Sequence, residues 1–181
     1  MIQGAFNPCK HWFLIRDTRF SSVLMIRISD PSGPVLALDL GLKYVGAAVS
    51  DDRLVTIKRL PALKRSNWKR LLKEVETLVS RLDAQTLVIG LPLRLDGTVG
   101  SAALDATRIA TNFAKSLKLP VYLQDERLTS FEARESLLSE GRDESEIKAL
   151  IDGEAAALIL RDFLHSDGSH RKVETNSSQN T

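Results

Sequence analysis

Short apolar runs separated by turn residues open the regularly patterned part of the chain. Residues 35–39 and 44–50 are two such runs, and the Gly41-Leu42-Lys43 segment between them has the length and composition of a hairpin turn. Residues 54–60 form a third run with strand character. We therefore expect an antiparallel meander of three strands at the start of the domain.

Helical and strand patterns alternate after this meander. Residues 66–82 carry apolar side chains at the spacing of one helical face, with Ser66 as the expected N-cap. Residues 86–91 have the pattern of a buried strand, residues 101–117 that of a helix, and residues 121–123 that of another strand. This alternation predicts helices packed on a sheet that is partly parallel.

A capping box, a further helix-start pattern and an alanine-rich run predict further helices towards the end of the chain. Thr129-x-x-Glu132 begins one helix, Asp143-x-x-Glu146 begins a second helical stretch, and the last helix carries Asp152 followed by an apolar run at 155–160. The complete order, β-β-β-α-β-α-β-α-α, predicts an α/β protein with a mixed five-stranded sheet flanked by helices.

The two ends of the chain lack this periodicity. Residues 1–33 are expected to be a poorly ordered N-terminal extension, with Met25 as an alternative start, and residues 166–181 a disordered tail. The predicted domain therefore spans residues 34–165. Because no apolar run approaches the roughly 18 residues of a membrane helix and residues 1–24 lack a signal-peptide pattern, we expect a cytoplasmic protein with no membrane partner.

Composition narrows the chemistry that this domain can carry. The chain has 181 residues and a net charge of only +2, so a nucleic-acid site would have to come from local basic patches. Its single cysteine, Cys9, excludes an internal disulfide and a site built from several thiolates. The histidines, His11, His165 and His170, lie outside the patterned region, so a nucleophile activated by histidine is not expected. Carboxylates remain as candidates.

Asp39 is the first candidate, because it ends an otherwise apolar strand and shares a face with Val35 and Ala37. A buried carboxylate costs several kcal/mol unless it is paired or binds a metal ion. The structural alternative is that Asp39 accepts hydrogen bonds from the turn that begins at Gly41. We favour a functional role, because charged residues are seldom buried without a partner.

Asp125, Glu126 and Asp152 are the other candidate acids. Asp125 and Glu126 follow the last strand at its carboxyl end, where sites in α/β sheets gather. Neighbouring strand residues face opposite sides, so only one of the two can share a site with Asp39, and the spacing leaves that choice open. Each acid also has a structural alternative as a carboxylate favoured by a helix N-terminus, and Asp152 alone fits that alternative better.

Three acids on three separate elements nevertheless suggest one shared site. Carboxylates close together repel one another and raise one another's pKa, and a divalent cation removes this repulsion. Ligands that are all oxygen favour Mg²⁺ or Mn²⁺ over zinc, and two such ions about 3.5–4 Å apart support displacement at phosphorus. The acids therefore point to phosphodiester chemistry with two metal ions.

Several cations are candidates for holding a phosphate backbone. Lys43 lies in the hairpin turn, Arg94 in the loop after residues 86–91, and Arg127 directly after Glu126, although each has a solvated surface charge as its alternative. Further candidates for phosphate contacts are the basic pairs Lys58-Arg59, Lys64-Arg65 and Lys69-Arg70. The helical spacing assigns Trp68, which lies among them, to the core.

Four segments of the chain resemble the YqgF family of the ribonuclease H-like superfamily. They are Leu38 to Gly46, Gly90-Leu91-Pro92-Leu93 through Gly97, Asp125-Glu126-Arg127-Leu128-Thr129-Ser130, and Asp152-Gly153-Glu154-Ala155-Ala156 through Leu160. They follow the family's order and spacing between about Val35 and Leu164. The resemblance implies a ribonuclease H-like fold and makes Asp39, Glu126 and Asp152 the catalytic and metal-binding acids, which selects Glu126 over Asp125.

The same resemblance implies an activity. It indicates a metal-dependent endonuclease with two Mg²⁺ or Mn²⁺ ions, acting as a monomer or homodimer on the 5′ end of pre-16S rRNA during ribosome biogenesis. A resolvase for branched DNA is the alternative, and a non-catalytic ribosome-assembly or RNA-binding factor is a further one. The Asp-x-Gly-x-x-x-x-Gly pattern of residues 39–46 also suits actin-like ATPases, but one compact domain is too short for their two lobes. Arg94 stands where many family members carry an uncharged polar residue.

Overall fold

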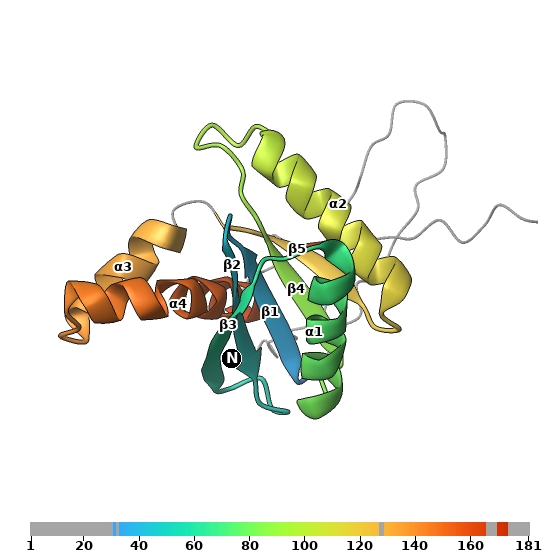
Figure 1. The fold of residues 1–181 in the computed structure, drawn as a ribbon, viewed down its shortest axis with the longest axis horizontal. Coiled ribbons are helices and arrows are strands. Elements are labelled where there is room, and N and C mark those ends of the chain that lie inside the picture. Colours follow the sequence, from blue (N-terminus) through green and yellow to red (C-terminus); the bar gives the residue numbers. More distant parts are fainter. Residues whose placement is uncertain (1–30, 32, 127–128, 166–169, 174–181) are drawn as a thin grey trace, which may run out of the picture. The chain divides into compact units, whose positions relative to one another are not determined.

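A six-stranded sheet of order β3-β2-β1-β4-β5-β6 forms the centre of the computed structural model, which describes residues 31, 33–126, 129–165 and 170–173 (Figure 1). The antiparallel meander consists of β1 (Val35–Leu40), β2 (Tyr44–Ser50) and β3 (Ile57–Lys64). Two further strands, β4 (Thr86–Leu91) and β5 (Val121–Asp125), run parallel to β1. This topology confirms the predicted mixed sheet in which a meander precedes β-α alternation. The predicted number of five strands is wrong by one, because the short strand β6 (His170–Lys172) adds a sixth at the edge next to β5.

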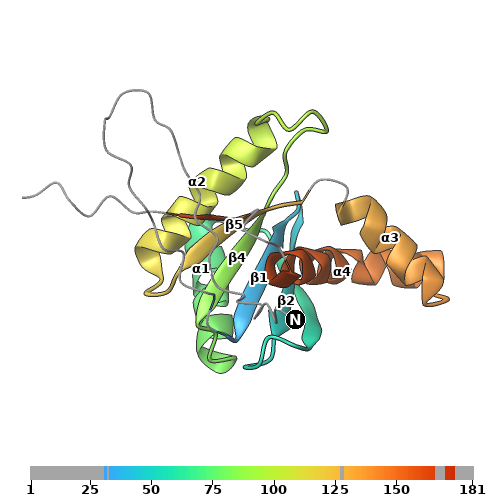
Figure 2. The same cartoon turned by 180° about the vertical axis from the view of Figure 1, so that it is seen from behind.

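Helices cover both faces of the sheet. One face carries α1 (Trp68–Arg81) and α2 (Ser101–Ser116), and the other carries α4 (Glu144–His165), as the two opposite views show (Figures 1 and 2). The remaining helix, α3 (Thr129–Ser139), packs along the first part of α4. None of the helices in the described part of the chain is long and apolar enough to span a membrane.

The alternation of side chains along the strands divides the core into two layers. On β1, Leu36 and Leu38 pack in the layer beneath α1 and α2, whereas Val35 and Ala37 pack beneath α4. The predicted apolar face of α1 lies against the first layer, and Trp68 contacts Phe113 of α2 with a ring-centroid distance of 4.9 Å. The assignment of Trp68 to the core is therefore confirmed.

The third strand begins and ends later than expected. It was predicted at residues 54–60 but spans Ile57–Lys64, because Leu54 belongs to a turn in which its N–H donates to the Asp51 carbonyl. Pro61 argues against a strand that runs past residue 60. The structure accommodates Pro61 because β3 is an edge strand and the pairing of β3 with β2 shifts register between Val45 and Ala47.

Two helix starts differ in detail from the sequence prediction. Asn67 caps α1 instead of Ser66, and its side-chain oxygen accepts from the Arg70 N–H at 3.0 Å. A helical stretch begins at Asp143-x-x-Glu146 as predicted, and the two residues form a capping box in which each side chain accepts from the backbone N–H of the other residue. The helix that it begins continues without a break to His165, so the two expected C-terminal helical stretches are one helix.

A short strand lies within the segment that was expected to be a disordered tail. Strand β6 (His170–Lys172) pairs antiparallel with β5, and Val173 N–H donates to the Val121 carbonyl at 2.8 Å. The tail prediction is therefore wrong for these residues. A three-residue edge strand is held by backbone hydrogen bonds and needs no apolar alternation, so the sequence carried no signal for it. The predicted N-terminal extension, apart from residues 31 and 33, lies outside the described residues.

Candidate active site

Two of the three predicted acids lie at the carboxyl ends of strands on the α4 side of the sheet. Asp39 follows Val35 and Ala37 in the alternation of β1 and therefore faces α4. On β5, Tyr122 faces α4, and the Glu126 N–H extends the strand pairing by donating to the Leu91 carbonyl at 3.3 Å. Glu126 consequently shares the face of Asp39, whereas the alternation turns Asp125 towards the α1 and α2 side.

Asp152 approaches the same face from α4. It lies in the middle of this helix, which begins at Glu144, so the alternative of an acid at a helix N-terminus does not apply to it. Its backbone carbonyl lies against Gly46 of β2, and Gly46 is the partner of Asp39 in the β1–β2 ladder. Asp152 is thus placed one strand away from Asp39.

Two glycines make this close approach possible. A Cβ atom at Gly46 would overlap the Asp152 carbonyl. A Cβ atom at Gly90 of β4 would overlap the Glu126 carboxylate and lie 2.7 Å from Ile159 Cδ1 of α4. Because neither glycine has a side chain, the Asp152 backbone can pack against Gly46 and the Glu126 carboxylate against Gly90.

The acids influence one another's protonation. Burial, followed by the nearby charge of Asp152, raises the pKa of Asp39 to about 6. Burial, followed by the charges of Asp39 and Asp125, raises the pKa of Glu126 to about 8. Asp39 therefore lies within electrostatic range of both Glu126 and Asp152. Because the three carboxylates interact electrostatically and are half-buried, their negative charges are unfavourable without a cation.

The arrangement is an open one. Among the described residues, no three carboxylate, histidine or cysteine side chains already lie close enough to enclose a metal ion. The donors are nevertheless of the kind that Mg²⁺ and Mn²⁺ prefer, since they are carboxylate oxygens. The raised pKa values of Asp39 and Glu126 show that their ionised forms are destabilised, and a bound cation would stabilise these ionised forms.

The predicted substrate-binding cations lie in two loops at this end of the sheet. Lys43 is exposed in the β1–β2 loop and Arg94 is exposed in the β4–α2 loop. The Arg94 side chain lies beside Gly100, the residue that caps α2. Arg127 lies outside the described residues.

Arg65 organises the β1–β2 loop, a role that the sequence analysis did not identify. Its guanidinium donates to the carbonyls of Gly41 at 2.7 Å and Leu40 at 3.3 Å, and it forms an ion pair with Asp105 of α2. Its backbone N–H donates to the Lys43 carbonyl at 2.9 Å. Arg65 therefore fixes the backbone that directly follows Asp39. In the sequence it was only one member of a basic pair.

A second unexpected group holds α4 in place. Glu154, which is 7% exposed, forms an ion pair with Arg59 of β3 at 2.9 Å and accepts from the Ser136 hydroxyl of α3 at 2.6 Å. Arg59 also pairs with Glu140 at 3.0 Å. These contacts join β3 and α3 to the turn of α4 that carries Asp152. Arg59 and Ser136 are far from Glu154 in the sequence, so no local pattern predicted these contacts.

Comparison with known proteins identifies relatives along most of the chain. A family model described as "RuvX: Holliday junction resolvase" matches residues 33–166. A "Putative pre-16S rRNA nuclease" of Synechococcus elongatus is 38% identical over 142 residues, which cover 78% of this chain and 95% of the relative. A protein of the same name from Anaeromyxobacter sp. is 37% identical over 135 residues, which cover 75% of this chain and 97% of the relative.

Solved structures with a similar chain course include two resolvases. T. thermophilus RuvC in complex with a Holliday junction substrate is 18% identical with a TM-score of 0.45, and the match covers 69% of this chain and 90% of that chain. The Fowlpox virus resolvase in complex with Holliday junction DNA is 15% identical with a TM-score of 0.46, and the match covers 73% and 97% of the two chains.

Proposed function

Because this chain belongs to the RuvX family and is a nuclease that hydrolyses phosphodiester bonds, we propose that it is a metal-dependent endonuclease that processes the 5′ end of pre-16S rRNA. One observation carries the proposal. Asp39, Glu126 and Asp152 come from three distant parts of the sequence, and all lie on the α4 side of the sheet around Asp39. Structural roles alone do not account for three acids gathered in a half-buried position.

The three acids are the proposed ligands and would hold Mg²⁺ or Mn²⁺ through their carboxylate oxygens, with Asp39 within electrostatic range of the other two. When bound, such ions supply an activated water and stabilise the leaving oxygen of the cleaved bond. The protein contributes the ligands and their placement: Arg65 fixes the backbone after Asp39, and Glu154 fixes the helix that carries Asp152. Lys43, Arg94 and Arg127 are proposed to hold phosphates on either side of the cut.

RNA is the proposed substrate because relatives at 37–38% identity over nearly their whole length carry the name of pre-16S rRNA nucleases. The family description favours a second candidate, cleavage of a Holliday junction. A third candidate, a non-catalytic ribosome-assembly factor, would retain its role without the acids.

One set of assays separates these candidates. Purified protein is incubated with a 16S precursor transcript, a transcript that already has the mature 5′ end, and a four-way DNA junction, with Mg²⁺, with Mn²⁺ or with chelator. We expect metal-dependent cuts in the precursor transcript and none by Asp39→Asn. Cleavage of the junction alone would establish the resolvase instead. Failure to cut any substrate, together with full complementation of a deletion strain by Asp39→Asn, would establish the non-catalytic factor.

A further inference from the structure

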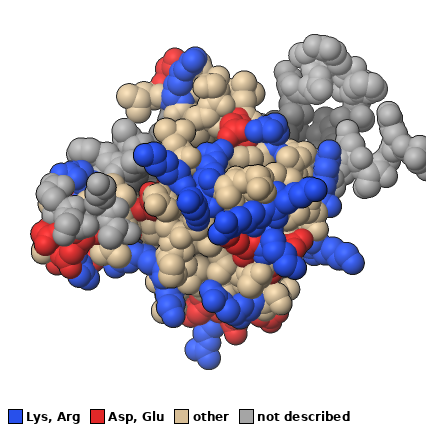
Figure 3. Space-filling model, in the orientation of Figure 1, with Lys and Arg blue, Asp and Glu red and all other residues tan. Residues whose placement is uncertain are grey.

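Basic residues are concentrated in one segment of a chain that is nearly neutral overall. Residues 57–81, which form β3 and α1, contain eight of the 25 Lys and Arg residues but only two of the 23 Asp and Glu residues. In the rest of the chain, acids outnumber bases by 21 to 17. Figure 3 shows Lys and Arg side chains gathered over α1 on the face that looks away from α4.

Four lysines in this segment, Lys58, Lys64, Lys69 and Lys73, are exposed and belong to none of the ion pairs found in the described part of the chain. Three of them, Lys64, Lys69 and Lys73, follow one another from the end of β3 along α1. We call them the α1 basic surface. Three of the four arginines of the segment differ, because Arg59, Arg65 and Arg70 are engaged by Glu154, Asp105 and Glu74. The fourth, Arg81, ends α1 and is exposed. The three lysines therefore remain available for an external anion.

The position of these lysines is unfavourable for α1 itself. Lys69 and Arg70 occupy its first turn, which contains no acid, although the helix dipole disfavours cations there. Lys69 and Lys73 are also one turn apart, a spacing at which like charges repel. Local helix stability does not explain this arrangement, whereas binding of a polyanion does.

The α1 basic surface is continuous with the active-site end of the sheet. Lys64 ends β3 opposite Tyr44, next to Lys43 in the β1–β2 loop that follows Asp39. Arg65 joins this loop to the start of α1 through its contacts with Lys43 and Gly41. From the loop, exposed lysines continue through Lys64 and Lys69 to Lys73.

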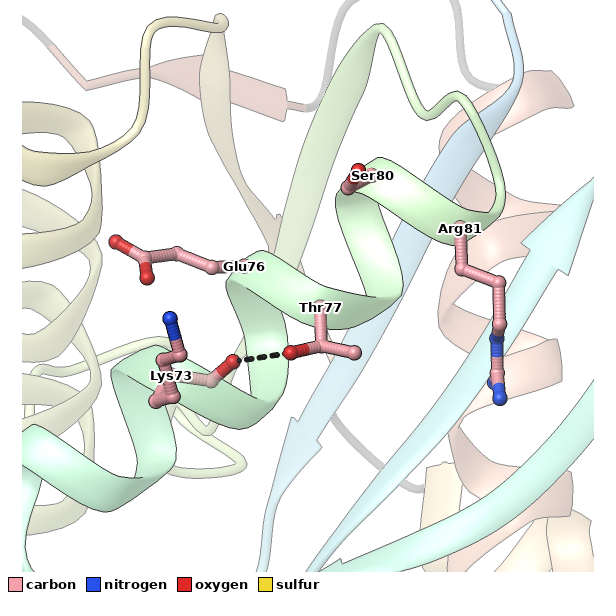
Figure 4. A pocket seen from close by; sticks show the side chains of 5 residues that line it. All are labelled: Lys73, Glu76, Thr77, Ser80 and Arg81. Carbon is pink, nitrogen blue, oxygen red and sulfur yellow. Dashed lines mark hydrogen bonds between the residues drawn. The ribbon is translucent and has the colours of Figure 1, made fainter.

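The surface suits an extended anion better than a small one. A shallow hollow along α1 is lined by Lys73, Glu76, Thr77, Ser80 and Arg81 (Figure 4). Glu76 extends to the same side as Lys73, and its carboxylate opposes a single anion bound in the hollow. A flexible polyanion can instead follow the lysines along the helix.

We propose that the α1 basic surface binds the phosphate backbone of the substrate nucleic acid beyond the scissile bond. This inference rests on the proposed nuclease function. The lysines contact phosphates without reading bases, so they lengthen the binding site and add affinity that depends on salt. A substrate that fills only the catalytic end of the sheet does not reach them.

Binding without cleavage tests this proposal. Wild type and the variant Lys64→Gln/Lys69→Gln/Lys73→Gln are titrated in chelator with labelled RNA and DNA of about 8 and about 30 nucleotides, at several salt concentrations. The matched control is Arg53→Gln/Lys115→Gln/Lys118→Gln, which removes three exposed cations without an ion pair in the described chain. Unchanged thermal unfolding verifies that each variant is folded.

We expect the surface variant to bind the long nucleic acid at least tenfold more weakly, to lose about two to three units of salt slope, and to bind the short one as wild type does. The control variant should match wild type with both lengths. Equal binding of the long nucleic acid by all three proteins would overturn the proposal, as would an equal loss with both lengths. Because no cleavage is measured, a protein that binds as predicted but cuts nothing would contradict the proposed function alone.

Discussion

The Glu126 carboxylate lies directly against the backbone of Gly90, in space that any side chain at that position would occupy. The Asp152 carbonyl stands in the same relationship to Gly46. Two acids from separate elements thus reach the sheet through gaps in the side-chain layer. The geometry of the candidate site therefore depends on glycine at position 46 of β2 and position 90 of β4 as well as on the acids.

Gly90→Ala should therefore disable the site while preserving the fold. The methyl group would displace the Glu126 carboxylate, which is the flexible end of a side chain, and we expect metal-dependent cleavage to fall about 100-fold or more. Single-turnover cleavage and circular dichroism would check this. Gly100→Ala is the control, because its Cβ would meet only ordinary contacts of 3.5 Å or more. Activity close to wild type in Gly90→Ala would contradict the placement of Glu126.

Gly46→Ala should instead destabilise the protein. Its Cβ would overlap backbone atoms of Asp152, so either α4 or β2 must move. Overpacking of this kind costs about 1–3 kcal/mol, and more where the backbone cannot shift. We therefore expect the free energy of unfolding, measured by chemical denaturation, to fall by about 2 kcal/mol or more. An unchanged unfolding midpoint would show that α4 does not lie on β2 as described.

The sequence was informative where a pattern repeats over several residues. The hairpin of β1 and β2, the apolar face of α1, the mixed sheet and the burial of Asp39 all follow from local periodicity, and family membership inferred from four motifs is confirmed. The strand alternation allowed either Asp125 or Glu126 to share the face of Asp39. The family resemblance selected Glu126, and the path of β5 relative to β1 places Glu126 on the face of Asp39.

What the sequence did not reveal depends on partners far apart in the chain. Arg65 binds carbonyls more than 20 residues away, and Arg59 meets Glu154 across 95 positions, so no spacing rule applies to either. Boundaries failed where two neighbouring residues suit the same role, as Ser66 and Asn67 both suit an N-cap. The roles of Asp39, Glu126 and Asp152 in catalysis stay predictions.

The buried acids should make the metal-free protein less stable as the pH rises. The folded-state pKa of Glu126 is about 8, against an ordinary value of 4.5, so between these pH values the folded protein holds a proton that the unfolded chain has lost. The free energy of unfolding therefore falls as pH increases from about 4.5 to about 8. Glu126→Gln removes the titrating carboxyl group and with it this decrease in the free energy of unfolding.

We expect Glu126→Gln to exceed wild type in free energy of unfolding by about 4 kcal/mol at pH 8 in chelator, and to equal it near pH 4. Urea denaturation at both pH values measures the difference. Glu135→Gln, on the exposed surface of α3, should follow wild type at both. A Glu126→Gln protein that is less stable than wild type at pH 8 would contradict the assigned pKa shift.

The same ionisations should make metal affinity depend on pH. Carboxyl groups bind a divalent cation after losing their protons, and the pKa values of Asp39 and Glu126 are raised to about 6 and about 8. We expect Mg²⁺ to bind roughly tenfold or more tightly at pH 8.5 than at pH 6.5, as measured by isothermal titration calorimetry. An affinity that is constant over this range would exclude these acids as ligands.

Loss of the Glu154 ion pair should destabilise the packing of α4. Glu154→Ala leaves Arg59 without its buried partner, and we expect a loss of about 2–3 kcal/mol in urea denaturation. Glu132→Ala offers a contrast, because its pair with Arg161 is exposed and spans 3.5 Å. Such a surface pair contributes about 0–1 kcal/mol. Equal effects of the two substitutions would argue against a special role for Glu154.

Binding of Mn²⁺ by wild type and single variants, followed by electron paramagnetic resonance at pH 8.5, tests the shared metal site most directly. The account predicts that wild type binds Mn²⁺ and that Asp39→Asn, Glu126→Gln and Asp152→Asn each bind it at least tenfold more weakly. Asp162→Asn, an exposed substitution on the same helix as Asp152, should bind as wild type does. Equal Mn²⁺ binding by all five proteins, or none by wild type, would contradict the convergence of the three acids on a metal site.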